Sequence, residues 1–267
     1  MQINGVNYHI ERTGYGPTLL LLHGFTGSGQ SWQPYLKDFT PYLHVVTIDL
    51  LGHGRSDAPV DSARYGMEYA ARDVVEVIDR IDVKPVHLLG YSMGGRLALY
   101  IAIHYPDRVA RLILESTSPG LRDSSERQQR CDADDRLAEF LETEGIVKFV
   151  NYWENIPLFA SQKRLPLAVQ AAQREQRLQN NPQGLAGSLR GMGTGRQPSL
   201  WDQLTSLDSP TQLIAGGLDT KFLVIAQQMH MHLPESRLTI SSNAGHAVHL
   251  EDSGMFTTCV LDFLMSD

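Results

Sequence analysis

Five short apolar runs, separated by longer segments, constrain the fold of this chain most. The runs are nearly continuous, and each ends in glycine or polar residues; they lie at residues 18–23, 44–49, 86–90, 111–115 and 211–215. Such runs are typical of strands that are buried on both faces of a parallel sheet. Helical patterns lie between several of them, at residues 69–81 and 94–105. The alternation predicts an α/β fold with a mostly parallel central sheet and helices on both faces.

Two parts of the chain depart from this alternation. Residues 2–11 alternate around Asn4-Gly5, a dipeptide typical of tight hairpins, so we expect two antiparallel edge strands there. Residues 120–209 contain no convincing strand, but they contain helical runs at 126–143, 147–154, 165–180 and 199–207. We therefore expect a core made of residues 1–119 and 210–267, with residues 120–209 inserted as a helical cap. We call residues 120–209 the helical insertion.

The charge balance argues against nucleic acid as a partner. The chain has 23 Lys and Arg against 30 Asp and Glu, a net charge of −7, and no basic block stands out. Nucleic-acid binders instead present clustered positive charge to the phosphate backbone. We therefore expect a small-molecule substrate and no nucleic-acid partner.

The cysteines and the apolar runs bear on the compartment. Cys131 and Cys259 lack the spacing of metal ligands, and residues 1–10 are polar where a secretory signal would be apolar. The longest apolar run, at residues 19–22, is far too short to cross a bilayer. These features predict a cytoplasmic protein without disulfides and without membrane insertion.

Residues 90–94 carry the strongest chemical signal. They read Gly-Tyr-Ser-Met-Gly, a match to G-x-S-x-G that directly follows a predicted strand and directly precedes a predicted helix. In that context the glycines permit a sharp turn that exposes the Ser92 hydroxyl, and the helix directs the positive end of its dipole toward it. A serine that merely caps a helix is the plain alternative, but the two flanking elements favour a nucleophile elbow.

A serine hydroxyl needs a base, and the base needs an acid to orient it, in the chain order Ser, Asp or Glu, His. Asp219 follows the predicted strand at 211–215 and is our candidate acid; Glu115, which ends another core strand, is its rival. His246 lies in a turn before a C-terminal helix and is our candidate base. His249, three residues further on, competes with it, although a histidine at the start of a helix is often a surface residue.

Two glycine-containing loops follow the first two central strands. The loop at residues 23–27, His-Gly-Phe-Thr-Gly, predicts the second wall of an oxyanion hole, with backbone N–H groups of Phe25 and Met93 as the donors. A loop that only makes a turn is the alternative. Residues 52–56, Gly-His-Gly-Arg-Ser, are interpreted as a structural turn without a chemical role.

Taken together, these motifs resemble those of the α/β-hydrolase superfamily over essentially the whole chain. The broad resemblance rests on residues 23–25, 49–56, 90–95 and 245–246. A narrower one, to the 2-succinyl-6-hydroxy-2,4-cyclohexadiene-1-carboxylate (SHCHC) synthases of menaquinone biosynthesis, rests on Tyr91, on Arg96, and on residues 118–121, 126–130, 149–153, 157–161, 191–195 and 197–201. Because these last segments lie mostly in the helical insertion, they are more specific than the superfamily motifs.

The narrower resemblance implies a lyase. It implies that a substrate with three carboxylates, 2-succinyl-5-enolpyruvyl-6-hydroxy-3-cyclohexene-1-carboxylate, loses pyruvate by proton abstraction and elimination, without a cofactor or a metal. The residues are compatible with this, since a Ser-His-Asp triad can act as a base and an oxyanion hole can hold an enolate. Triad geometry alone does not distinguish this lyase from a serine hydrolase of an ester or of a carbon–carbon bond in a diketone. A non-catalytic receptor on the same fold would have no reason to keep the three triad residues.

The cationic residues separate the lyase from the hydrolase. A polyanion bound to a protein of net charge −7 requires local arginines, whose planar guanidinium groups match carboxylates. The resemblance selects Arg96, Arg130 and Arg177 as substrate ligands, with Tyr91 and Trp153 as wall residues. Inside the helical insertion the resemblance does not decide between Arg130 and its neighbour Arg127. It likewise leaves the choice between Arg177 and Arg174 open.

Overall fold

The centre of the molecule is a seven-stranded sheet. The structure is a computed structural model, and it describes residues 1–81 and 85–266. The strand order is β3-β5-β4-β6-β7-β8-β9, and every neighbouring pair is parallel except β3 with β5. The strands are β3 (Ile10–Thr13), β4 (Thr18–Leu22), β5 (His44–Ile48), β6 (Val86–Tyr91), β7 (Val109–Glu115), β8 (Thr211–Gly216) and β9 (Ser236–Ser241). The mostly parallel α/β sheet expected from the apolar runs is therefore confirmed, since each of the five runs forms one of these strands.

The N-terminal prediction was only partly right. The Asn4-Gly5 turn does join two antiparallel strands, β1 (Gln2–Ile3) and β2 (Val6–Asn7), but they form a separate two-stranded sheet. The antiparallel edge of the main sheet is β3 alone. The expected antiparallel pair is therefore present, but it does not form an edge of the main sheet, because only the next segment, β3, pairs with β5.

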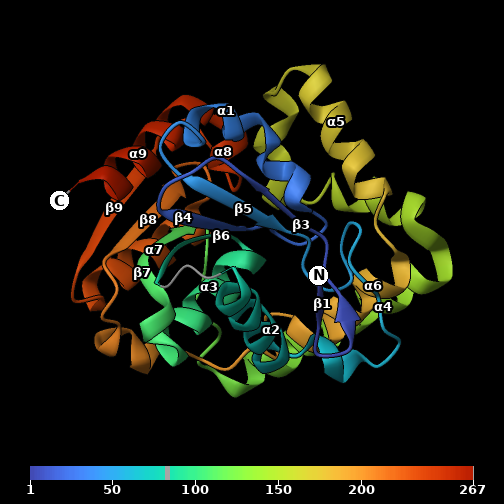
Figure 1. Cartoon of the computed structure of the whole chain (residues 1–267). Coiled ribbons are helices and arrows are strands. Elements are labelled where there is room, and N and C mark those ends of the chain that lie inside the picture. The colour runs from blue at the N-terminus through green and yellow to red at the C-terminus, as the bar shows by residue number, and fades with distance from the viewer. Residues whose placement is uncertain (82–84, 267) are drawn as a thin grey trace.

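Helices cover both faces of the sheet, and strand residues alternate between two apolar clusters. Leu20 and Leu22 of β4 pack with one cluster, whereas Leu19 and Leu21 pack with the other. The first cluster includes α2 (Met67–Arg80), α3 (Met93–His104) and α7 (Thr220–His232); the second includes η1 (Gly29–Tyr35), α1 (Leu36–Phe39), α8 (Val248–Glu251) and α9 (Ser253–Met265). Figure 1 shows α2 and α3 on one side of the sheet and α1 and α9 on the other. The sheet thus forms a rigid platform between two helical layers.

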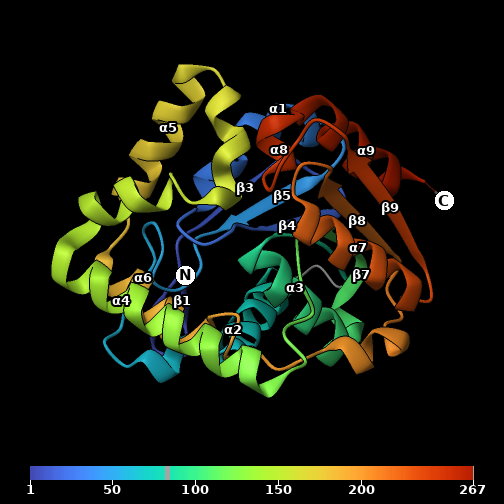
Figure 2. The same cartoon turned by 180° about the vertical axis from the view of Figure 1, so that it is seen from behind.

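Between β7 and β8 the described chain forms helices and no strand. The elements are α4 (Ser124–Trp153), η4 (Pro157–Arg164), α5 (Leu167–Leu178), α6 (Pro182–Met192) and η5 (Trp201–Ser206). α4 covers two of the expected helices, which meet at Gly145, a residue with a non-helical backbone (φ 79°). The expected helix at 199–207 is instead the short 3-10 helix η5, and α6 was not predicted. Figure 2 shows α4, α5 and α6 together on one side of the molecule, opposite the C-terminus.

Close contacts attach α6 and the residue Asn180 before it to the core. A Cβ atom on Gly184 of α6 would lie 2.3 Å from the carbonyl oxygen of Gly52, whose own φ is +80°. Asn180, which is buried just after α5, accepts a hydrogen bond from the N–H of Gly54 (3.0 Å) and donates one to the carbonyl of Thr26 (2.9 Å). α6 and the end of α5 therefore pack against the turn at residues 52–56.

Candidate active site

Ser92 lies in a sharp turn between β6 and α3. Its φ and ψ are 51° and −106°, a region that residues other than glycine rarely adopt. The turn is tight enough that a Cβ atom on Gly94 would lie 2.4 Å from the carbonyl oxygen of Leu22 on the neighbouring strand. The Ser92 N–H donates to the carbonyl of Glu115 (2.9 Å), which ties the turn to β7. Local packing thus holds the hydroxyl away from both the strand and the helix.

The three residues expected to form a triad lie in one hydrogen-bonded row. The Nε2 atom of His246 is 3.0 Å from the Oγ atom of Ser92, and its Nδ1 atom is 2.6 Å from an oxygen of Asp219. Asp219 follows β8 and His246 follows β9, so adjacent strand ends bring them together. Asp219 also accepts the N–H of Phe222 (3.2 Å) as the N-cap of α7, which orients its carboxylate. The arrangement suits transfer of the serine proton to His246.

The two rival residues pair with each other instead. Both carboxylate oxygens of Glu115 lie 2.9 Å from Nδ1 of His249, and the His249 N–H donates to the same carboxylate. Both side chains are almost completely buried, so His249 is not the surface residue that a histidine at a helix start often is. The ring of Tyr91 contacts both histidines, at 4.7 Å from the His249 ring and 5.5 Å from the His246 ring. A second carboxylate–imidazole pair therefore lies beside the candidate triad.

We expect Glu115→Leu to lower the free energy of unfolding by about 3–5 kcal/mol. The reason is that removal of one partner from a buried pair leaves the other buried and unpaired. Urea unfolding of the variant and of the unchanged chain measures this loss. A variant with unchanged stability but with turnover as low as that of Ser92→Ala would instead make Glu115 the triad acid.

Ser92 and His246 open into a large cavity of about 360 Å³. Phe25 and Met93, the residues expected to supply the oxyanion-hole donors, both line it. Its remaining wall is largely apolar and comes mainly from the helical insertion, with Trp153 among the lining residues as expected. The ring of Phe25 packs edge-on against Trp153 at 5.3 Å. The candidate triad and the insertion thus share one cavity.

Two of the three selected arginines line this large cavity. Arg96 donates to the carbonyl of Met192 (2.9 Å) and to the side-chain oxygen of Gln197 (3.0 Å), and burial lowers its pKa to about 10. Arg130 pairs with Asp134 at 2.8 Å, while burial raises the pKa of that carboxyl. Arg127 does not line the cavity and donates to the carbonyl of Gly195. The structure therefore places Arg130, rather than Arg127, at this wall.

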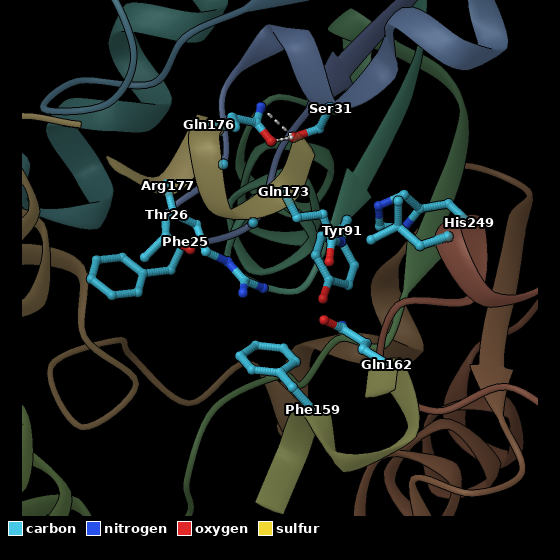
Figure 3. Close-up of a pocket in the computed structure, with 13 residues that line it drawn as sticks. Phe25, Thr26, Ser31, Tyr91, Phe159, Gln162, Gln173, Gln176, Arg177 and His249 are labelled. Atoms are coloured by element: carbon cyan, nitrogen blue, oxygen red, sulfur yellow. Dashed lines mark hydrogen bonds between the residues drawn. The ribbon is translucent and has the colours of Figure 1, made fainter. Parts of the chain in front are cut away.

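Arg177 lines a second, smaller cavity (Figure 3). Its guanidinium carbon lies 5.2 Å from the centre of the Phe159 ring, and burial lowers its pKa. Arg174, the alternative in the register, points elsewhere and binds Glu154 (2.5 Å) and Asn151 (2.6 Å). Tyr91, Phe25 and Phe159 line both cavities, so the two spaces adjoin.

Comparison with known proteins places this chain in a family. A family model described as the alpha/beta hydrolase fold matches residues 17–253. A Bacillus subtilis protein provisionally named SHCHC synthase is 46% identical over 98% of this chain and 96% of its own length. The SHCHC synthase of Enterobacter sp. (strain 638) is 31% identical over 93% of this chain and 92% of its own length. The chain belongs to the SHCHC synthase family of α/β-hydrolases.

A solved structure extends this result. MenH from S. aureus has a TM-score of 0.92 and 39% sequence identity, and the match covers 96% of this chain and 97% of that one. The expected α/β-hydrolase fold is thereby confirmed. In this family member, none of the helices in residues 1–81 and 85–266 is apolar and long enough to span a bilayer.

Two polar residues at the cavities were missed by the sequence analysis. Lys221 follows Asp219 by two residues and lines the large cavity, and Gln162 in η4 lines the small one. The position of Lys221, in the first turn of the helix that follows the candidate acid, was a usable signal. Gln162 gave no such signal, because its orientation depends on how η4 packs.

Proposed function

We propose that this family member is a lyase of menaquinone biosynthesis. It eliminates pyruvate from 2-succinyl-5-enolpyruvyl-6-hydroxy-3-cyclohexene-1-carboxylate and releases SHCHC. The observation that carries the proposal is the pairing of a Ser92–His246–Asp219 row with arginines in the same cavity, in a chain that shares the sequence and fold of SHCHC synthases. A base and cationic carboxylate ligands together are what the elimination needs.

In the proposed reaction the triad acts as a base. His246 takes the proton of the Ser92 hydroxyl, and the Ser92 oxygen removes the proton from the ring carbon that bears the succinyl group. The electron pair moves through the ring double bond, and the carbon–oxygen bond to the enolpyruvyl group breaks. The enolpyruvyl oxygen leaves with that electron pair as the enolate of pyruvate, which takes up a proton at its methylene carbon, while His246 gives up the proton it took and becomes neutral again. Asp219 holds the histidine in position and stabilises its positive charge.

The oxyanion hole stabilises the charge that develops in this step. Loss of the ring proton places negative charge on the succinyl carbonyl oxygen, which becomes an enolate. The N–H groups of Met93, at the start of α3, and of Phe25, in the loop after β4, are the proposed donors. Arg96 and Arg130 bind carboxylates of the same substrate, with Tyr91 and Trp153 as walls, and Arg177 serves the adjoining space.

Incubation of the purified chain with the enolpyruvyl substrate tests the proposal directly. We expect pyruvate release, measured with a coupled lactate dehydrogenase assay, together with the appearance of the conjugated diene in the ultraviolet. Absence of both, with rapid cleavage of a neutral activated ester, would favour the alternative of a serine hydrolase. The mostly apolar wall of the large cavity is the observation that keeps this alternative open.

We also propose that the helical insertion is a lid over the large cavity. It supplies Trp153 and Arg130 to the wall, yet α5 has no buried residue of its own. We expect backbone amides of α4 and α5 to exchange more slowly with deuterium when the product is bound, because the ligand would hold the helices against the core. Hydrogen-exchange mass spectrometry measures this. An exchange pattern that product leaves unchanged would contradict the lid.

A further inference from the structure

The buried Glu115–His249 pair joins two segments of the candidate triad. Glu115 is the last residue of β7, and its backbone carbonyl accepts the N–H of Ser92 (2.9 Å). Its carboxylate accepts the backbone N–H of His249 and lies 2.9 Å from Nδ1 of the same residue. His249 follows His246 by three residues. Glu115 therefore holds the turn that carries Ser92 through its main chain and the segment that carries His246 through its side chain.

Few other hydrogen bonds fix the position of His246 relative to Ser92. Within residues 1–81 and 85–266, the segment 246–251 is hydrogen-bonded to β6, β7 and the turn after β6 only through Ser92 and Glu115. The first of these contacts is the proton-transfer contact itself. The alignment of the imidazole with the hydroxyl therefore depends on the contact between Glu115 and His249.

The surroundings of His249 leave its ring little freedom to move. Three aromatic rings lie 5.2–6.0 Å from the His249 ring, between centres, and belong to Trp32, Tyr35 and Phe256. On the side toward the triad, the ring of Tyr91 packs against the rings of both His249 and His246 (Figure 3). The Glu115–His249 pair is therefore a fixed point from which the segment with His246 extends.

A core at this place does not need a carboxylate–imidazole pair for stability. The cluster around His249 is apolar, and apolar residues of similar volume are often as stabilising as a buried pair, because desolvation offsets much of the attraction. Two apolar side chains would not supply a directed contact. The carboxylate only accepts hydrogen bonds, and by accepting the backbone N–H and facing Nδ1 it fixes both the main chain and the ring of His249.

We propose that Glu115 and His249 are positioning residues for the triad. They hold the segment after β9 so that Nε2 of His246 stays within hydrogen-bond distance of the Ser92 hydroxyl. Neither Glu115 nor His249 lines the large cavity, so they act through the triad and not on the substrate. The consequence for turnover rests on the proposed function, in which Ser92 passes its proton to His246. A displacement of about 1 Å in such a contact lowers a rate roughly 100-fold.

The reactivity of Ser92 toward a fluorophosphonate tests the alignment without the substrate. The Ser92 oxygen attacks phosphorus and fluoride leaves, while His246 accepts the proton of the hydroxyl, so the rate of adduct formation reports how well the two are aligned. Mass spectrometry of the intact chain measures this rate. We expect Glu115→Gln and His249→Phe each to lower it roughly 10-fold or more.

A conservative variant distinguishes the hydrogen bond from packing. The side-chain nitrogen of His249→Asn can take the place of Nδ1, whereas His249→Phe keeps the ring and loses the donor. We expect the asparagine variant to form the adduct faster than the phenylalanine variant, although it fills the aromatic surroundings less well. The absence of an adduct at Ser92 in the unchanged chain, or unchanged rates in Glu115→Gln and His249→Phe, would overturn the proposal.

A double variant separates positioning from stability. Glu115→Leu combined with His249→Phe removes both polar side chains, so it should resist urea better than Glu115→Leu alone. Its rate of adduct formation should nevertheless stay as low as that of the single variants. Recovery of this rate together with stability would make the pair only structural and would overturn the proposal.

Asp73→Asn is the matched control. Asp73 is as deeply buried as Glu115 and pairs with Arg64 at 2.7 Å, but it lines neither cavity. Its replacement should lower stability in urea and change the rate of adduct formation less than twofold. A loss of Ser92 reactivity in Asp73→Asn as large as in Glu115→Gln would show that any damaged buried carboxylate disturbs the triad, and the positioning role would be refuted.

Turnover of the enolpyruvyl substrate tests the consequence for the proposed function. Because Glu115 lines neither cavity, Glu115→Gln should lower kcat roughly 10-fold and change KM less than twofold. A raised KM with unchanged kcat, or a loss of kcat as large as that of Ser92→Ala, would contradict a positioning role. If the unchanged chain forms the adduct but releases no pyruvate, the proposed function is wrong, and the rates of adduct formation still decide the positioning role.

Discussion

Ser92→Ala should lower kcat for pyruvate release by roughly 10²- to 10⁴-fold, the usual contribution of a positioned base. The hydroxyl is 3.0 Å from His246, and in the proposed reaction it is the atom that removes the substrate proton. His246→Ala should cause a similar loss, because the serine then has no acceptor for its own proton. Asp219→Asn should also lower turnover, while it keeps an oxygen to cap α7.

The losses should not add, because the three residues act as one unit. A triple variant should therefore be about as slow as the worst single one, with rates taken from initial velocities of pyruvate release. Thermal unfolding of each variant is the control for an intact fold. Near-normal turnover by Ser92→Ala would contradict the proposed mechanism. A mild effect of Asp219→Asn together with a severe effect of Glu115→Gln would mean that Glu115 is the triad acid. The roles of Ser92 and His246 would be unchanged.

The arginines should discriminate between a polyanionic and a neutral substrate. Replacement of Arg96, Arg130 or Arg177 by alanine should weaken transition-state binding of the native substrate by about 2–5 kcal/mol, the cost of removing one partner of a buried charge pair. A desolvated carboxylate without its guanidinium keeps its full burial cost, whereas a neutral ester never had one. The measurement is kcat/KM for the enolpyruvyl substrate and for a neutral activated ester.

The internal contacts of Arg96 make lysine substitution a useful second comparison. Arg96 also donates to Met192 and Gln197, so its removal leaves two buried acceptors without a donor and has a structural cost. That cost should reduce activity on both substrates equally, and only the additional loss on the native one reports carboxylate binding. Lysine should restore little of it, since a point charge cannot reproduce two parallel hydrogen bonds. Equal losses on both substrates throughout would mean that the arginines are structural.

The sheet and the row of Ser92, His246 and Asp219 could be predicted because local signals specify them. Apolar runs buried on both faces read as parallel strands, and such strands place residues that follow them at one edge of the sheet. The choice between His246 and His249 was harder. Both follow β9 closely. Only the three-dimensional structure shows that Glu115 pairs with His249 and that Asp219 pairs with His246.

The helical insertion was less predictable for a physical reason. α6 contains Gly184, Gly187 and Gly191, which disfavour a helix in isolation, and its glycines are explained only by the close approach of Gly52 and Tyr65. The separation of Arg177 from the other two arginines likewise depends on the packing of α5 and η4, on which periodicity carries no information. Gln162 was missed for the same reason.

The contact between Gly52 and Gly184 has a consequence for engineering this fold by recombination. A Cβ at either position would meet backbone of the other, and one on Gly187 would lie 2.5 Å from the Tyr65 ring. In a chimaera that carries only residues 120–209 on a foreign scaffold, α6 would therefore clash with the side chains of that scaffold. The residues equivalent to Gly52 and Tyr65 have to be transferred together with the insertion. The smallest exchangeable unit is thus discontinuous in sequence, and crossovers chosen at the ends of the insertion alone would divide it.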